Sequence, residues 1–222
     1  MAGANPMLPT MTRALLARRE RIALCDLVLA LGEDAPTLCG EWTAKELVVH
    51  LLVREYDPVA AAGLVLPPLA RVTELQMARK GRQDFAVLVE RLRRRGPTVF
   101  SLRPVDKVLN TLEYYVHHED VRRAQPGWTP RDLPREDEDA IWSALKVYGR
   151  GLVRPAGVPA RIRRTDTGAT AVLRRGSDPV VLSGLPSELS LALFGRQAQT
   201  HGVSADGPDD RVSRLWSADL GI

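Results

Sequence analysis

Glu113 and His117 form the pair of residues in this sequence whose types and spacing best suit chemistry. They lie four positions apart, so on a helix they project from one face, one turn apart. A carboxylate and an imidazole at that separation can share one divalent metal ion. His50, far upstream at the end of an apolar run, is a third candidate ligand. Three ligands from two helices would leave a zinc-like ion one open coordination position, where chemistry can take place.

The same spacing also has a purely structural explanation. Glu and His four residues apart occur on many helices, and Glu46 and His50 repeat the pattern. The surroundings favour the metal, because His50 stands among aliphatic residues, where an imidazole needs a polar partner or a metal to remain buried. His118 points to another side of its helix than His117, so we expect it to be partly exposed. It would replace His117 as a ligand if the helix were rotated.

Other polar side chains near this pattern have simpler predicted roles. Asp120, one turn after His117, can accept a hydrogen bond from the imidazole nitrogen that is not on the metal. His201 falls in a predicted loop and is expected to be exposed. Cys25 and Cys39 form no CxxC pair, and we interpret them as buried, unpaired thiols.

The elements that must position these residues are mostly helices. Thr43 and Glu46 form a Thr-x-x-Glu capping box at the start of the helix that carries His50. After Pro155 the pattern changes to short strand-like runs, with a hairpin turn at Asp166-Thr167-Gly168. The predicted helices cover about 11–31, 43–57, 71–95 with a break near residue 81, 104–125, 134–149 and 188–196, and the predicted strands cover 160–164, 169–174 and 180–182. This pattern predicts a helical bundle over residues 10–152 and a small α+β domain over 153–222.

Composition excludes several classes of protein. The chain has 222 residues, of which 45% are hydrophobic and 26% charged, the balance of an ordinary globular protein. No apolar run reaches the roughly 18–20 residues that span a bilayer, and the N-terminus lacks a secretion signal. We therefore predict a cytoplasmic protein that does not bind membranes. The net charge of +4 permits nucleic-acid binding, but the arginine pairs are scattered and aromatic residues make up only 5%.

Taken together, these residues resemble the DinB-like superfamily, and within it the mycothiol-dependent maleylpyruvate isomerase-type proteins. The resemblance runs from about residue 10 to about residue 200. It is carried by Leu38-Cys39, by Trp42-Thr43 with His50 after it, by the Glu113/His117 pair, and by Glu188–Arg196 near the C-terminus.

The resemblance implies a metal-dependent enzyme on a four-helix bundle, so the predicted fold class is mainly α with a small C-terminal α+β domain. A divalent ion, usually zinc in that family, would be held by His50, Glu113 and His117. The open position would take mycothiol, whose coordinated thiol loses its proton and attacks a small electrophile, as a thiol S-transferase or a thiol-assisted isomerase does. The resemblance also places Arg196 near the active site, where it could pair with a substrate carboxylate, and Arg54 is a second candidate for that role.

Two other functions remain open at this point. One is a non-catalytic metal-binding stress-response protein on the same bundle. The other is a nucleic-acid-binding protein, which only the basic charge suggests, and we expect no nucleic-acid partner. The pattern does not distinguish a monomer from a homodimer and does not name the electrophile.

Overall fold

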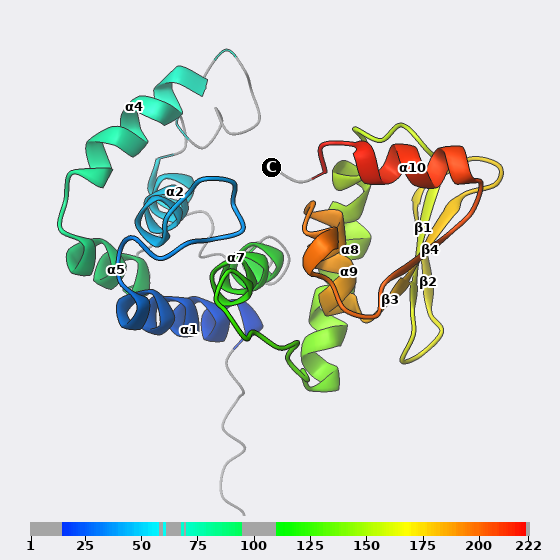
Figure 1. The fold of residues 1–222 in the computed structure, drawn as a ribbon, viewed down its shortest axis with the longest axis horizontal. Coiled ribbons are helices and arrows are strands. Elements are labelled where there is room, and N and C mark those ends of the chain that lie inside the picture. The colour runs from blue at the N-terminus through cyan, green and yellow to red at the C-terminus, as the bar shows by residue number, and fades with distance from the viewer. Residues whose placement is uncertain (1–14, 58–59, 61–67, 69, 95–109, 221–222) are drawn as a thin grey trace, which may run out of the picture.

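The protein is mainly helical, with one small sheet towards its C-terminus (Figure 1). A computed structural model describes residues 15–57, 60, 68, 70–94 and 110–220. The helices are α1 (Leu16–Leu31), α2 (Ala44–Tyr56), α4 (Ala70–Gly81), α5 (Phe85–Arg93), α7 (Thr111–Arg123), α8 (Arg135–Leu152), α9 (Pro186–Leu193) and α10 (Asp209–Ser217), with a short 3-10 helix at Gln197–Gln199. The strands are β1 (Ala160–Arg164), β2 (Thr170–Arg174), β3 (Val180–Gly184) and β4 (Ser204–Asp206).

The N-terminal half packs as a helical bundle. Helix α1 lies against α7 and α5, and α2 lies against α5 and α4 (Figure 1). Their apolar faces meet in one hydrophobic cluster that contains Leu24 of α1, Leu51 of α2, Leu88 of α5 and Tyr114 of α7, all 0–1% exposed. The mainly α fold predicted from the sequence is confirmed.

A second hydrophobic cluster joins α8, α9, α10 and the sheet. Helix α7 belongs to both clusters, because Tyr114 enters the first while Tyr115 and Val116 enter the second. Packing on both sides leaves nearly all of α7 buried, including the charged residues Glu119, Asp120 and Arg123. Such buried charge must be paired or must bind a ligand. Helix α7 is therefore the element on which polar side chains have to find specific partners.

The sheet has the strand order β2-β1-β3-β4, with β1 antiparallel to β2, parallel to β3, and β3 antiparallel to β4. The predicted hairpin is confirmed, and Gly168 takes a φ of 73° in its turn, which favours glycine. In Figure 1 the sheet lies on the side of α8 and α9 that is farther from the N-terminal bundle. The small C-terminal α+β region is thus confirmed, while its predicted boundary at residue 152 stays a prediction.

The structure differs from the sequence prediction mainly at helix ends and near the C-terminus. The predicted capping box of α2 forms, with Thr43 and Glu46 bonded reciprocally. Helix α9 starts earlier than predicted, at Pro186, and ends at Leu193, before the positive φ of Gly195. Strand β4 and helix α10 were not predicted. The predicted starts of the first helix and of the helix at residue 104 lie outside the described residues. None of the described helices is long and apolar enough to cross a membrane.

Candidate metal centre

The three predicted metal ligands come together between α2 and α7. His50 lies in the second turn of α2, whose start the capping box fixes. Glu113 and His117 lie one turn apart on α7. Glu113 Oε1 stands 3.4 Å from Nε2 of His50 and 3.4 Å from Nε2 of His117. All three ligand atoms lie within 4.8 Å of one another.

These separations suit a tetrahedral cation better than they suit hydrogen bonds. At 3.4 Å the two His–Glu contacts are long for a hydrogen bond. Zinc–ligand bonds of about 2.0–2.1 Å in tetrahedral geometry separate neighbouring ligand atoms by about 3.3–3.4 Å. Two imidazoles and a carboxylate are also a donor set that zinc accepts. The residues present therefore fit a divalent ion.

His50 is the ligand with the fewest protein partners. Its side chain is 8% exposed, and its Nδ1 is buried without a hydrogen-bond partner among the residues that the structure describes. Its ring lies 5.1 Å from the Trp42 ring and 5.3 Å from the His117 ring, measured between centroids. Burial lowers the pKa of His50 below 6.5, more than the hydrogen bond to Glu113 raises it. The imidazole is therefore neutral at pH 7, as a metal ligand must be.

Arg54 keeps Glu113 ionised. Its Nε lies 3.2 Å from Glu113 Oε1, and its Nη1 donates to Asn110 Oδ1 at 2.9 Å. Burial would raise the pKa of Glu113, but the Arg54 guanidinium and hydrogen bonds to the two imidazoles hold it well below 4.5. The structure thus places Arg54, predicted as a partner for substrate, directly against a metal-ligand candidate.

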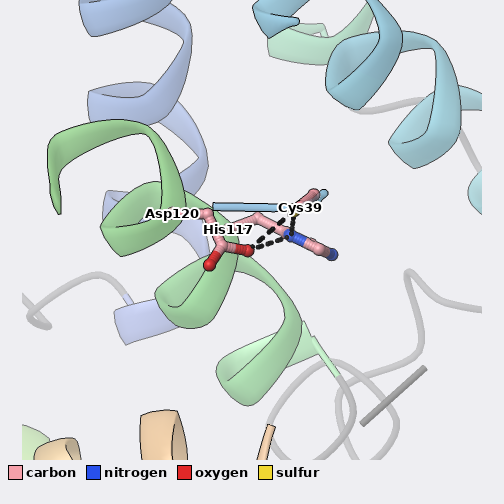
Figure 2. Close-up of side chains that lie close together, drawn as sticks. All are labelled: Cys39, His117 and Asp120. Carbon is pink, nitrogen blue, oxygen red and sulfur yellow. Dashed lines mark hydrogen bonds and ion pairs between the residues drawn. The ribbon is translucent and has the colours of Figure 1, made fainter. Parts of the chain in front are cut away.

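Cys39 and Asp120 lie next to His117 (Figure 2), and Arg196 lies against Asp120, so these three form a second group of polar side chains. His117 Nδ1 is 2.9 Å from Asp120 Oδ2, so the predicted bond to the carboxylate is present. Burial would lower the pKa of His117, but hydrogen bonds to Asp120, Cys39 and Glu113 raise it well above 6.5. With Nδ1 held by Asp120, the Nε2 atom of His117 faces Glu113, and a cation there would displace its proton.

Asp120 is the centre of this second group. It is fully buried and receives Arg196 Nε on Oδ1 and Arg196 Nη2 on Oδ2, both at 2.8 Å. The Cys39 thiol donates to Oδ2 at 3.0 Å. Burial would raise the pKa of Asp120, yet hydrogen bonds from His117 and Arg196 hold it at about 2. One carboxylate therefore ties the loop before α2, helix α7 and the segment after α9 together.

Arg196 reaches this site because of how α9 ends. Gly195 has a φ of 81°, and the Arg196 N–H bonds back to Leu191 O at 2.9 Å, as in a Schellman motif. A Cβ on Gly195 would stand 2.5 Å from the carbonyl oxygen of Leu220, so no other residue fits without a shift of the backbone. Arg196 also donates through Nη1 to Phe194 O. The turn directs its guanidinium onto Asp120.

A pocket of about 230 Å³ opens beside these residues. Its walls include His50, His117, Cys39 and Arg196, so candidate metal ligands and the arginine face one space. The remaining lining residues come from the loop before α2 and from the C-terminal segment: Leu38, Gly40, Trp42, Asp219 and Leu220. Sequence reasoning did not identify the C-terminal wall, because no motif there indicates a site.

Two predictions about individual residues were wrong. His118 is not partly exposed: it is 6% exposed, and its Nδ1 lies 2.7 Å from Glu20 Oε2, on the side of α7 that faces α1. Cys39 is not a buried core thiol like Cys25, but a half-buried one that lines the pocket. The position of Cys39 next to the Trp42-Thr43 motif was the only signal that could have indicated this. His201 is exposed, as predicted.

Comparisons with known proteins add evidence at the level of the fold. No protein-family model and no curated protein matches the sequence. Two crystal structures match, one of the mycothiol-dependent maleylpyruvate isomerase and one of its histidine-to-alanine mutant. The chain has the fold of that isomerase. Each match covers 86% of this chain and 90% of the other, with a TM-score of 0.57 and 16% sequence identity. At this identity the isomerase likeness shows the fold alone, and it confirms the resemblance in fold predicted from the sequence.

Proposed function

We propose that the chain is a metal-dependent enzyme that uses mycothiol as its thiol cosubstrate. The observation that carries the proposal is the set of three ligand atoms from His50, Glu113 and His117, which lie within 4.8 Å of one another beside a pocket, with both His–Glu separations at 3.4 Å. The isomerase fold supports the thiol, since the name of that protein includes mycothiol dependence. We propose zinc as the ion, because two imidazoles and one carboxylate are a donor set that zinc accepts in catalytic sites.

The three ligands would leave a fourth position directed at the pocket. A divalent ion held there would lower the pKa of a bound thiol, so that a thiolate nucleophile exists at neutral pH. The chain's own contribution is to hold the ligands in place: Arg54 keeps Glu113 ionised, and Asp120 fixes the orientation of His117. Cys39 and Trp42 help to enclose the pocket.

Arg196 would orient the electrophile. Its guanidinium lines the pocket while Asp120 fixes it from behind through two hydrogen bonds. A fixed guanidinium can receive a substrate carboxylate and keep it in register with the attacking thiol. We therefore propose a small electrophile with an anionic group, which the thiolate attacks at carbon. If the attack expels a leaving group with its bonding electrons, the product is the S-transfer product. If it opens a double bond conjugated to a carbonyl, the electrons move to that carbonyl, and rotation about the resulting single bond followed by expulsion of the thiolate restores the double bond as the isomer. We propose Arg54 as a positioning residue, because it contacts Glu113.

Metal binding is the first test. Purified protein should hold about one equivalent of zinc per chain by elemental analysis, consistent with one site of three protein ligands. His50→Ala, Glu113→Gln and His117→Ala should each lose the ion. The matched control is His118→Ala, an equally buried histidine on the same helix that faces Glu20, and it should keep the metal. Retention of zinc by all four variants would contradict the proposed site.

Thiol dependence separates catalysis from mere metal storage. Zinc-loaded protein should bind mycothiol in a calorimetric titration, while His50→Ala protein should not. Turnover of small electrophiles, maleylpyruvate among them, should require both metal and thiol, and Arg196→Ala should lower the rate with the metal content unchanged. Protein that binds zinc but shows neither thiol binding nor turnover would instead be the non-catalytic metal-binding protein.

A further inference from the structure

A groove of about 540 Å³ lies where the end of α8 meets β2. It shares no lining residue with the pocket at the metal centre. Val172 and Leu173 of β2 line it together with four arginines. Two of these are Arg150 in the last turn of α8 and Arg154 just after that helix, and the other two are Arg174 at the end of β2 and Arg175 just after it. This groove has no role in the proposed reaction.

The walls of the groove are held close together. Gly149 of α8 packs on Leu173 of β2, and a Cβ on Gly149 would stand only 2.8 Å from Leu173 Cδ2. The missing side chain lets the helix approach the strand at this point. Arg150 directly follows Gly149, and Arg174 directly follows Leu173. Arg150 and Arg174 therefore lie in two elements that are packed directly together, and Arg154 and Arg175 lie just beyond the ends of those elements.

The four arginines have no carboxylate partner within the described parts of the chain. All four are exposed, and none takes part in an ion pair or side-chain hydrogen bond found among those residues. By contrast, Arg164 at the other end of the hairpin is held by Asp139 and Asp166. Clustered positive charge without counterions creates a potential that attracts an anionic partner.

The groove also borders an open sheet edge. Strand β2 is the first in the order β2-β1-β3-β4 and pairs only with β1. The outer edge of such a strand presents unpaired N–H and C=O groups, to which an extended chain can add. Val172, in the middle of β2, is 40% exposed and offers an apolar contact to such a chain.

The charge of the groove decides what kind of chain fits. A second copy of this protein paired edge to edge would bring two sets of four arginines together, which is unfavourable. The undescribed segments of this chain do not fit either, because residues 1–14 contain Arg13 and no acid, and residues 95–109 carry a net positive charge. An extended segment of another protein, with carboxylates that alternate along it, complements both the backbone edge and the arginines.

We propose that β2 and the end of α8 bind an acidic, extended segment of a partner protein, which adds to β2 as an outer strand. Main-chain hydrogen bonds to the edge of β2 provide affinity, and the four arginines select acidic side chains. This surface is independent of the metal centre, so the interaction does not require the proposed reaction.

The test uses the full chain and a short fluorescent peptide of alternating glutamate and valine, followed by fluorescence polarisation. The double variant Arg150→Glu/Arg174→Glu should weaken binding about tenfold or more, because two attractive charge contacts become repulsive. The matched control, Arg18→Glu/Arg79→Glu, makes the same charge change at exposed arginines of α1 and α4 and should bind as the unaltered chain does. A lysine–valine peptide should not bind.

Hydrogen exchange and a DNA duplex distinguish strand addition from simple charge attraction. Bound peptide should slow amide exchange in Thr170–Arg174 and leave β4, at the opposite edge, unchanged. The proposal is overturned if the peptide does not bind, if both double variants weaken binding equally, or if β2 gains no protection. It is also overturned if a short duplex binds the groove more tightly than the peptide, since the surface would then select phosphates.

Discussion

Helix α7 carries buried charge on two of its sides, and the two sides are built in different ways. Towards α1 and α9, Arg123 holds Glu188 through two hydrogen bonds of 2.6 and 2.9 Å and holds Glu119 at 2.5 Å. Arg131 donates hydrogen bonds to Glu20 at 2.8 and 2.9 Å, and its Nε lies 2.6 Å from Glu119 Oε1 as an ion pair. We call Glu20, Glu119, Arg123, Arg131 and Glu188 the ion cluster. Every one of its charges faces an opposite charge at short range.

Towards α2 the same helix presents a much looser arrangement. The contacts of Glu113 with His50 and His117 are both 3.4 Å, and His50 Nδ1 has no hydrogen-bond partner in the described part of the chain. Burying polar groups costs free energy unless their hydrogen bonds are made. The ion cluster makes most of these bonds within the protein: only Arg131 Nε lacks a hydrogen bond there, and it still lies 2.6 Å from Glu119 Oε1. In the candidate metal centre no opposite charge stands against His50 Nδ1 among the described residues, and an added cation would complete the set of three ligand atoms. The His–Glu contacts of the candidate metal centre are long, whereas the contacts within the ion cluster are short. We use this difference in length to distinguish a binding site from a structural ion pair.

The largest predicted effect is on the ion cluster. Arg123→Met leaves Glu119 and Glu188 buried without their main partner, and removing one member of such a pair costs about 3–5 kcal/mol in free energy of unfolding. Urea denaturation of metal-free protein measures this loss. Zinc affinity of the remaining folded protein should not change. As a control, Arg122→Met removes a more exposed partner of Glu119, with its side chain 23% exposed, and should cost about 1 kcal/mol or less. Equal losses in the two variants would remove the contrast between the two sides of α7.

The next effect concerns Asp120, which supports the metal centre from behind. Asp120→Asn weakens the hold on His117 and should lower zinc affinity about 10–100-fold, as is usual for carboxylates behind a metal-bound histidine. Competition with a chromophoric chelator measures it. Glu119→Gln is the matched control: it is the adjacent buried carboxylate, but it belongs to the ion cluster. Glu119→Gln should lower stability and leave the zinc affinity of folded protein unchanged. If Glu119→Gln lowered the zinc affinity and Asp120→Asn did not, Glu119 rather than Asp120 would be the carboxylate that supports the candidate metal centre.

A smaller effect tests the turn at Gly195, which positions Arg196 at the site. Gly195→Ala forces an alanine into a positive φ and against Leu220 O, so it should cost more than the roughly 1 kcal/mol expected from the positive φ alone. Gly202→Ala has a φ of 64° and no atom within 4 Å of the added carbon, so it measures the cost of the φ alone. Thermal denaturation compares the two. A loss no greater for Gly195→Ala than for Gly202→Ala would show that the approach of Leu220 does not constrain this turn.

The smallest effect is a pH dependence that arises in the ion cluster. Burial would raise the pKa of Glu20, but hydrogen bonds from His118 and Arg131 outweigh it and lower the pKa below 4.5. Because the pKa is lower in the folded state, Glu20 stabilises the fold above the pKa of the unfolded chain, and that stability is lost as the pH falls towards the folded pKa. Urea denaturation from pH 6 to pH 3 should therefore show a shallower loss of stability in Glu20→Gln than in the unaltered chain. Parallel curves would show that Glu20 titrates normally.

Local features were predictable from the sequence because neighbours in the chain determine them. The capping box of α2, the β1–β2 hairpin and the helical spacing of Glu113 and His117 all depend on residues within a few positions of one another. Strand β4 escaped prediction because it covers only Ser204–Asp206 and exists by pairing with β3. The exposure of His118 was misjudged for a related reason. Its partner, Glu20, is almost a hundred positions away, so only packing reveals it.

The sequence alone determined which side chains could bind a metal, since residue type and helical periodicity fix which atoms share a face. It also determined that the fold is mainly helical. Only the tertiary structure decided that α7 would be buried on both sides and that its two charged faces would become an ion cluster and a candidate metal centre. It also decided that Cys39, Asp120 and Arg196 would meet. The physical reason is that burying a charge is unfavourable until a partner is placed against it, and partners distant in the chain are placed by packing.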